Sequence, residues 1–144
     1  MSIPRLTVVT LGVADLDKAT RFYETVFGHR PNPDYKEISF FDLPGTWISL
    51  YPLDKLAEDI SAQLSPDRAG FSGITLAYNA RSRDEVRSVF AAVEAAGATV
   101  VKAPQDTFWG GFSGYFSDLD GHYWEVVWGS MFDFAPDGAL RFKT

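Results

Sequence analysis

The chain has 144 residues, of which 46% are hydrophobic, 15% aromatic and 22% charged, and it has no cysteine. This composition predicts a single globular domain and excludes a disordered, collagen-like or disulfide-stapled protein. The net charge of −6 argues against a nucleic-acid partner, because binding to phosphates needs a basic face. Because the sequence shows neither a signal segment nor an apolar run that could span a bilayer, we expect a cytoplasmic protein with no membrane partner.

The first half of the chain predicts a strand, a helix and two further strands. In chain order we expect a strand at 6–13, a helix at 16–27 and short strands at 36–42 and 46–51. Asp15 has the side chain of a helix N-cap, and Gly28 suits the left-handed conformation in which a helix ends. A further short strand near His29 would complete a module of the order strand, helix, strand, strand, strand.

The second half repeats this order. Between the two halves we expect a connecting helix and linker at 53–70. Within the second half we expect strands at 73–78, 99–102, 111–117 and 122–128. Ser82 with Glu85 forms a capping-box pattern at the start of a helix that Gly97 ends. A Pro-Asp-Gly turn within 131–144 predicts a C-terminal extension that forms a small hairpin or covers a sheet edge.

Two short alignments indicate an internal repeat. The segment Val9-Thr10-Leu11 matches Ile74-Thr75-Leu76, and the segment 41–49 matches 116–125 with one extra residue before the turn glycine. The aligned pairs include Gly45 with Gly121, Trp47 with Tyr123 and Ser49 with Glu125. Module one therefore covers about 5–52 and module two about 71–130.

Four sequence segments carry a family resemblance. They are Leu11-Gly12-Val13-Ala14-Asp15-Leu16, Arg21-Phe22-Tyr23, Phe27-Gly28 and Asp118-Leu119-Asp120-Gly121-His122-Tyr123-Trp124-Glu125. With these motifs the chain resembles the vicinal oxygen chelate superfamily, which contains glyoxalase I, extradiol dioxygenases and the bleomycin and fosfomycin resistance proteins. The resemblance implies a single α+β domain over 1–144, in which two tandem βαβββ modules form a curved, cup-like mixed sheet with helices on the outside. Members of this family are often homodimers.

The resemblance also implies where a metal ion would be held, because the first and last strand of each module supply the ligands. In this chain the corresponding positions are Val8, Ser49, Gly73 and Glu125. Only Glu125 is a good ligand, because valine and glycine lack a donor atom and a serine hydroxyl binds such ions poorly. His122 is at an odd separation from Glu125 and so on the opposite face, and His29 follows a helix in a polar loop. We therefore predict no metal and no other cofactor.

Strand alternation predicts which side chains line the cup. The expected ligand-binding residues are Thr10, Trp47, Ser49, Thr75, Trp109, Tyr115 and Tyr123. Trp109 and Tyr115 belong to the segment 107–116, whose three glycines and five aromatic residues predict a loop at the pocket edge. Trp109 would either stack on a planar ligand or plug the cup as part of the core.

Glu125 is the candidate catalytic residue. A carboxylate among Tyr, Trp and Val side chains is costly to bury unless it is paired, hydrogen-bonded or protonated. The expected function is binding of a small planar or amphipathic molecule in the aromatic cup without a metal. The alternative is a lyase or isomerase of the same superfamily, with Glu125 as general base or as part of an unrecognised divalent-metal site. A third hypothesis is a structural or partner-binding domain whose cup is filled by its own side chains.

Overall fold

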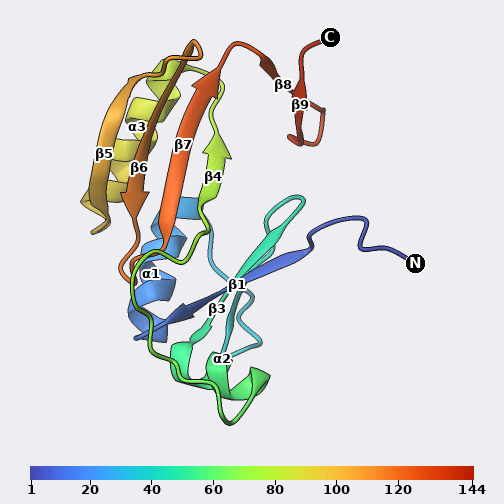
Figure 1. Cartoon of the computed structure of the whole chain (residues 1–144), viewed down its shortest axis with the longest axis vertical. Helices are drawn as coiled ribbons and strands as arrows, with labels where there is room; N and C mark the ends of the chain where they lie inside the picture. The colour runs from blue at the N-terminus through green and yellow to red at the C-terminus, as the bar shows by residue number, and fades with distance from the viewer. The chain divides into compact units, whose positions relative to one another are not determined.

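Figure 1 shows the computed structural model, which describes residues 1–144. Contacts between Cα atoms divide the chain into two units, Met1–Ser72 and Gly73–Thr144, and each unit combines helix with sheet. The α+β class predicted from the sequence is therefore confirmed. None of the helices is long and apolar enough to cross a membrane.

The first unit contains a three-stranded sheet and two helices. Its elements are β1 (Val8–Val13), α1 (Leu16–Phe27), β2 (Ser39–Phe41), β3 (Trp47–Pro52) and α2 (Leu53–Ile60). The strand order is β1-β3-β2, with β1 parallel and β2 antiparallel to the central β3. Because parallel strands need a long connection, α1 lies in the chain between β1 and β3.

The boundaries of α1 follow from its capping residues. The Asp15 carboxylate accepts a hydrogen bond from the Lys18 N–H at 3.0 Å, and the helix ends at Gly28, which has a φ of 75°. Tyr23 is buried, and its ring centroid lies 6.5 Å from that of Phe41 on β2. Aromatic contacts therefore join the apolar face of the helix to one face of the sheet.

The fourth strand expected near His29 does not form in the first unit. Residues 28–38 consist of turns, bends and irregular chain, because Pro31 and Pro33 lack the N–H groups that a strand would need. One backbone hydrogen bond, from the Asn32 N–H to the Phe40 carbonyl at 3.0 Å, ties this loop to β2. The loop thus remains next to the sheet without extending it.

The second unit contains a four-stranded sheet, one helix and a C-terminal hairpin. Its elements are β4 (Leu76–Asn79), α3 (Arg83–Ala95), β5 (Thr99–Asp106), β6 (Gly111–Ser117), β7 (Tyr123–Gly129), β8 (Phe132–Phe134) and β9 (Leu140–Phe142). The sheet has the order β4-β7-β6-β5, with β4 parallel to β7 and the other pairs antiparallel (Figure 1). In both units, then, the strand before the first helix pairs in parallel with the strand that ends the module.

Helix α3 begins at the predicted capping box. The Ser82 hydroxyl accepts a hydrogen bond from the Glu85 N–H at 3.0 Å. The Glu85 carboxylate in turn accepts hydrogen bonds from the Arg81 N–H at 2.7 Å and from the Tyr78 hydroxyl on β4. Burial, followed by the hydrogen bond to Glu85, raises the pKa of Tyr78 to about 12. The start of the helix is therefore tied directly to the neighbouring strand.

Helix α3 covers one face of the sheet (Figure 1), and aromatic side chains lie between the two. The Phe90 ring meets Phe116 edge-on, and Phe116 stacks on Trp124, with centroids 6.1 Å apart in both pairs. Gly114 belongs to the same row, because an added Cβ there would lie 2.8 Å from the Phe90 ring. Alternation along β7 therefore places Glu125 on the opposite face of the sheet.

Two strands of the second unit differ from their predicted bounds. Strand β4 begins at Leu76 rather than at Gly73, because Gly73 has a φ of 82°, which an extended strand does not contain. Thr75 lies outside the strand and is exposed. Strand β5 continues to Asp106, with register shifts on both sides of Lys102 that let it follow β6 further than expected.

The Asp-Leu-Asp-Gly turn sets where β7 begins. The buried Asp118 carboxylate accepts hydrogen bonds from the N–H groups of Asp120 and His122, each at 2.9 Å. Gly121 completes the turn with a φ of 79°. The turn thereby fixes the register of β7 against β6 and the position of Glu125 in the sheet.

The C-terminal extension forms a small hairpin of β8 and β9. Phe132 and Phe142 stack across it, with ring centroids 5.6 Å apart. The Arg81 guanidinium lies 4.1 Å from the centre of the Phe134 ring, close enough for a cation–π contact. This contact joins the hairpin to the residues before α3.

We predict that Phe41→Ala lowers the free energy of unfolding by about 3–5 kcal/mol, because it leaves a cavity beneath α1. Phe41 is 0% exposed and contacts the rings of Tyr23 and Phe27. The control Ile60→Ala, at a residue 70% exposed, should change it by less than about 0.5 kcal/mol. Urea denaturation measures both, and equal effects would contradict the assignment of Phe41 to the core.

Candidate functional site

In the first unit, the face of the sheet opposite α1 carries Ser49, and we call it the Ser49 face. Its members are Val8, Thr10, Gly12, Phe40, Trp47, Ser49 and Tyr51, which alternation and strand register place together. Thr10 on β1 and Phe40 on β2 flank Ser49 on β3 as register partners. Leu53, at the start of α2, packs on this face, because a Cβ added at Gly12 would lie 2.5 Å from its side chain.

The polar groups of the Ser49 face satisfy one another. The hydroxyl oxygens of Thr10 and Ser49 are 2.6 Å apart in a hydrogen bond, and Ser49 is buried with only 1% of its surface exposed. The family resemblance puts Val8 and Ser49 at the metal-ligand positions of this module, but Val8 pairs with Trp47 and has no donor atom. The only donor group at a ligand position of this module, the Ser49 hydroxyl, is therefore already bonded to Thr10.

Trp47 is the first residue of β3, at one end of the Ser49 face, and lines a hollow. The hollow has a volume of about 200 Å³ and is lined by Asn32, Tyr35, Phe40, Asp42 and Trp47. Of these five residues, the sequence predicts only Trp47 at a binding site. Phe40 could have been found from strand alternation, whereas the two loop residues Asn32 and Tyr35 come near β2 through a backbone bond that no sequence pattern signals.

In the second unit, the face of the sheet opposite α3 carries Glu125, and we call it the Glu125 face. Its members include Ala77, Lys102, Ser113, Tyr115, Tyr123, Glu125 and Val127. The central row runs across the sheet from Ala77 on β4 through Glu125 and Tyr115 to Lys102 on β5. Glu125 is partly buried and lies between an apolar and a hydroxyl-bearing neighbour.

Tyr115 is the partner of the Glu125 carboxylate. Burial, the negative charge of Glu125 and the hydrogen bond with Glu125 together raise the pKa of Tyr115 above its ordinary value of 10.0. The phenol therefore stays protonated at neutral pH and, as the register partner of Glu125, lies where it can donate to the carboxylate. A carboxylate has acceptor sites for several donors, so this bond leaves room for a further one.

The other predicted members of this site are separated from Glu125 along the strands. Strand alternation predicts Thr75 in the same cup as Glu125, but the register places Ala77 opposite Glu125 and leaves Thr75 outside β4. Tyr123 begins β7 opposite Ser117 and lies on the Glu125 face. The hydrogen-bond partner is thus the tyrosine on β6, and the left-handed turn at Gly73 is why Thr75 is displaced.

Trp109 lies against two glycines on the Glu125 face. Gly111 and Gly129 are register partners on β6 and β7. A Cβ added at Gly111 would lie 2.1 Å from the Trp109 ring, and one added at Gly129 would lie 2.9 Å from it. Only glycine leaves space for the indole at these positions. The tryptophan is therefore held against the sheet over the Gly111–Gly129 pair, which lies four residue pairs from the Tyr115–Glu125 pair along the strands.

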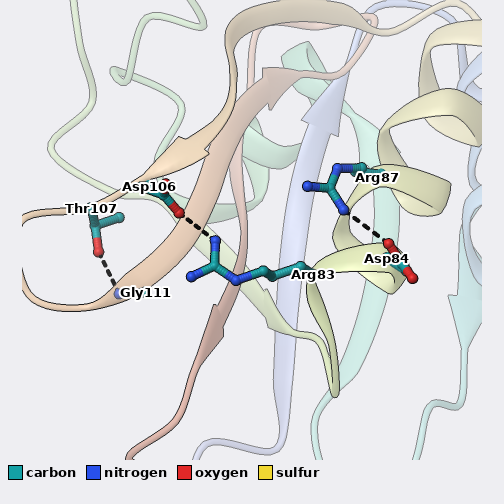
Figure 2. A network of polar contacts seen from close by, with 6 residues as sticks. All are labelled: Arg83, Asp84, Arg87, Asp106, Thr107 and Gly111. Carbon is teal, nitrogen blue, oxygen red and sulfur yellow. Dashed lines mark hydrogen bonds and ion pairs between the residues drawn. The ribbon is translucent and has the colours of Figure 1, made fainter.

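Polar contacts hold the turn that carries Trp109, as Figure 2 shows. The Thr107 hydroxyl accepts a hydrogen bond from the Gly111 N–H at 2.8 Å. An ion pair between Arg83 and Asp106 connects the end of β5 to the start of α3, and Arg83 and Asp106 are drawn beside this turn in Figure 2. The segment 107–116 is therefore a short turn followed by the regular strand β6, rather than a loop throughout.

The donor atoms of these faces do not fit a divalent metal ion. Of the four positions that the resemblance assigns to ligands, Val8 and Gly73 have no donor atom, and the Ser49 hydroxyl is bonded to Thr10. Glu125 alone remains, and a single carboxylate is too few ligands for such an ion. Neither unit brings together three or more His, Asp or Glu side chains that could hold one.

Comparison with known proteins identifies relatives along most of the chain. The family model described as Glyoxalase/Bleomycin resistance protein/Dioxygenase superfamily matches residues 5–126. A protein of Lysinibacillus sphaericus named metallothiol transferase FosB is 24% identical over 133 residues, covering 92% of this chain and 88% of its own. Its namesake in Shouchella clausii is 29% identical over 126 residues, covering 85% of this chain and 79% of its own.

Solved structures share the fold. A glyoxalase-related enzyme from Fulvimarina pelagi has a TM-score of 0.86 and 29% identity, and the match covers 99% of this chain and 100% of that one. A lactoylglutathione lyase from Agrobacterium tumefaciens has a TM-score of 0.67 and 22% identity, with 93% of this chain and 100% of that one covered. The second likeness concerns the fold alone.

We predict that Glu125→Gln lowers the pH at which Tyr115 ionises, because it removes both the negative charge and the carboxylate that accepts the phenol proton. Ultraviolet absorbance of tyrosinate measures this titration, and a Tyr115→Phe variant identifies the Tyr115 signal. Tyr78, with a pKa of about 12, serves as an internal control that should not move. An unchanged Tyr115 titration in Glu125→Gln would disprove the pairing.

We predict that Gly111→Ala destabilises the fold by about 1–3 kcal/mol, because the new methyl group overlaps the Trp109 ring. In a Trp109→Ala background, the same substitution should cost about 1 kcal/mol less, since the ring is gone. Chemical denaturation of the two single variants and the double variant measures this difference. Strict additivity would show that Trp109 does not occupy the space above Gly111.

Proposed function

Because the chain belongs to the glyoxalase/bleomycin resistance protein/dioxygenase superfamily, we propose that it binds a small planar or amphipathic molecule on the Glu125 face without a metal ion. The observation that carries this proposal is the Glu125–Tyr115 pair: a partly buried carboxylate held by a protonated phenol on a face that also carries Trp109. Such a carboxylate can anchor an N–H, O–H or cationic group of a ligand.

The surroundings of Glu125 support a ligand with an apolar body. Aromatic side chains offer large, rigid contact surfaces, and binding sites combine such surfaces with a few placed polar groups. Tyr115 lies across from Glu125 on β6, Tyr123 lies two residues before it on β7, and Trp109 lies further along the same face. A planar or amphipathic molecule can therefore contact the aromatic rings while its polar group meets Glu125.

The donor set supports binding without a metal. A metal-dependent activity of the kind implied by the name of the FosB relatives needs several ligand side chains, and this chain supplies one. Hydrogen bonding and aromatic contact are the interactions that the Glu125 face supplies to a ligand.

A second candidate function is a lyase or isomerase in which Glu125 is a general base. The Tyr115–Glu125 pair favours it, because a carboxylate and a protonated phenol in contact can exchange protons with a substrate at neighbouring positions. A turnover assay separates this candidate from binding alone. If Glu125 is the base, Glu125→Gln should abolish turnover while the substrate still binds. Turnover retained in this variant would exclude that role.

The binding function predicts that a ligand raises the thermal unfolding temperature of the protein and changes its tryptophan emission, because it binds only the folded state. We would screen planar aromatic metabolites and antibiotics against the chelator-treated protein. For any compound that binds, Glu125→Gln should weaken binding by about tenfold or more, as expected for loss of a charge-assisted hydrogen bond. The matched control is Glu94→Gln, at an exposed acid on α3, which should leave binding unchanged.

Elemental analysis tests whether the protein contains a metal ion. Protein purified without chelator should contain no stoichiometric zinc, nickel, manganese or iron, and adding these ions should leave ligand binding unchanged. A stoichiometric metal, or binding that appears only with an added ion, would overturn the metal-free proposal. Equal binding by the wild type and Glu125→Gln would instead remove Glu125 from the site.

A further inference from the structure

The hollow beside the Ser49 face has the composition of an aromatic cage. Three of its five lining residues are Tyr35, Phe40 and Trp47, and the other two are Asn32 and Asp42. The rings meet at steep angles: Tyr35 and Phe40 are 5.2 Å apart at 83°, and Phe40 and Trp47 are 6.2 Å apart at 63°. Several ring faces and edges therefore border one small volume.

The cage is held in shape by the sheet and its adjoining loop. Phe40 is the register partner of Ser49, and Trp47 is on the same face of β3. The backbone bond from Asn32 to Phe40 brings the loop that carries Tyr35 against β2. The Asn32 side-chain oxygen accepts a hydrogen bond from the Asp34 N–H at 3.0 Å, which fixes the loop further. The cage is therefore formed before a ligand binds.

We propose that this hollow binds a tertiary or quaternary alkylammonium group. Ring faces attract cations through their negative quadrupole, and the nearby Asp42 carboxylate adds a formal negative charge. Alkylation matters because an alkylated ammonium has few or no N–H groups to satisfy and is less strongly hydrated than a primary one. The volume of about 200 Å³ is well above the roughly 10–15 Å³ that a cavity needs to admit one water molecule.

The exposure of the rings agrees with a binding surface rather than a core. Trp47 is 42% exposed and Tyr35 is 54% exposed, although both are large aromatic side chains. The net charge of −6 also favours cations over anions near the protein. Cation binding in this hollow adds a ligand class to the small-molecule binding proposed above. It uses neither Glu125 nor Tyr115, so the hollow and the Glu125 face can be tested and can fail separately.

The test uses choline chloride as the probe and, as a control, the uncharged alcohol in which a tert-butyl group replaces the trimethylammonium group. Both are titrated into isotope-labelled full-length protein at matched ionic strength, and nuclear magnetic resonance follows the Trp47 indole N–H, assigned with Trp47→Phe. Choline should shift this signal saturably, with an affinity at least about threefold above that of the alcohol. Equal shifts with the two compounds, or no saturable shift with choline, would overturn the proposal.

Variants locate the site. Trp47→Leu and Asp42→Asn should each weaken choline binding by about threefold to tenfold, read from the remaining shifted signals of the cage. Asp34→Asn, at an exposed acid in the same loop that does not line the hollow, is the matched control and should leave the affinity unchanged. A retained spectrum confirms that each variant folds.

Glu125→Gln separates this inference from the proposed function. It should leave choline binding unchanged, because no residue of the second unit lines the hollow. Loss of choline binding in Glu125→Gln, with binding retained in Trp47→Leu, would place the cation on the Glu125 face and overturn the cage. Loss in the Trp47 and Asp42 variants alone supports the cage even if no ligand for Glu125 is found.

Discussion

Packing of one amphipathic helix against one face of each sheet is the constraint on which both units depend. In the first unit Tyr23 of α1 meets Phe41 of β2, and in the second Phe90 of α3 meets Phe116 of β6. Because side chains alternate along a strand, burying one row beneath a helix assigns the next row to the other face. The polar and aromatic residues of the Ser49 and Glu125 faces follow from this alternation.

The two modules use equivalent positions for different chemistry. In the first, the hydroxyls of Ser49 and Thr10 bond to each other and close the position to other partners. In the second, Glu125 is bonded by Tyr115 from the adjacent strand, which holds the carboxylate while leaving acceptor capacity. A shared backbone arrangement therefore carries one self-satisfied pair and one pair able to meet a ligand, as expected when function lies in side chains rather than in the fold.

The aromatic residues also divide by their neighbours. Trp124 stacks on Phe116 under α3, whereas Trp109 lies over two glycines on the opposite face. Trp47 remains partly exposed at the rim of a hollow with an acidic residue. The high aromatic content thus comprises a helix-covered core and surfaces suited to contact with other molecules.

Local patterns determined the bounds of α1, the capping of α3 and the strand β6, because capping, glycine and alternation signals act between near neighbours in the chain, and the family resemblance implied the α+β class. They also identified Glu125, since a carboxylate within an apolar strand is costly without a partner. The tertiary structure decided that Tyr115 faces Glu125 across β6 and β7, that Trp109 lies on Gly111 and Gly129, and that Tyr35 and Asp42 join Trp47. These outcomes depend on the register between strands and on the path of an irregular loop, which are fixed by contacts between residues far apart in sequence.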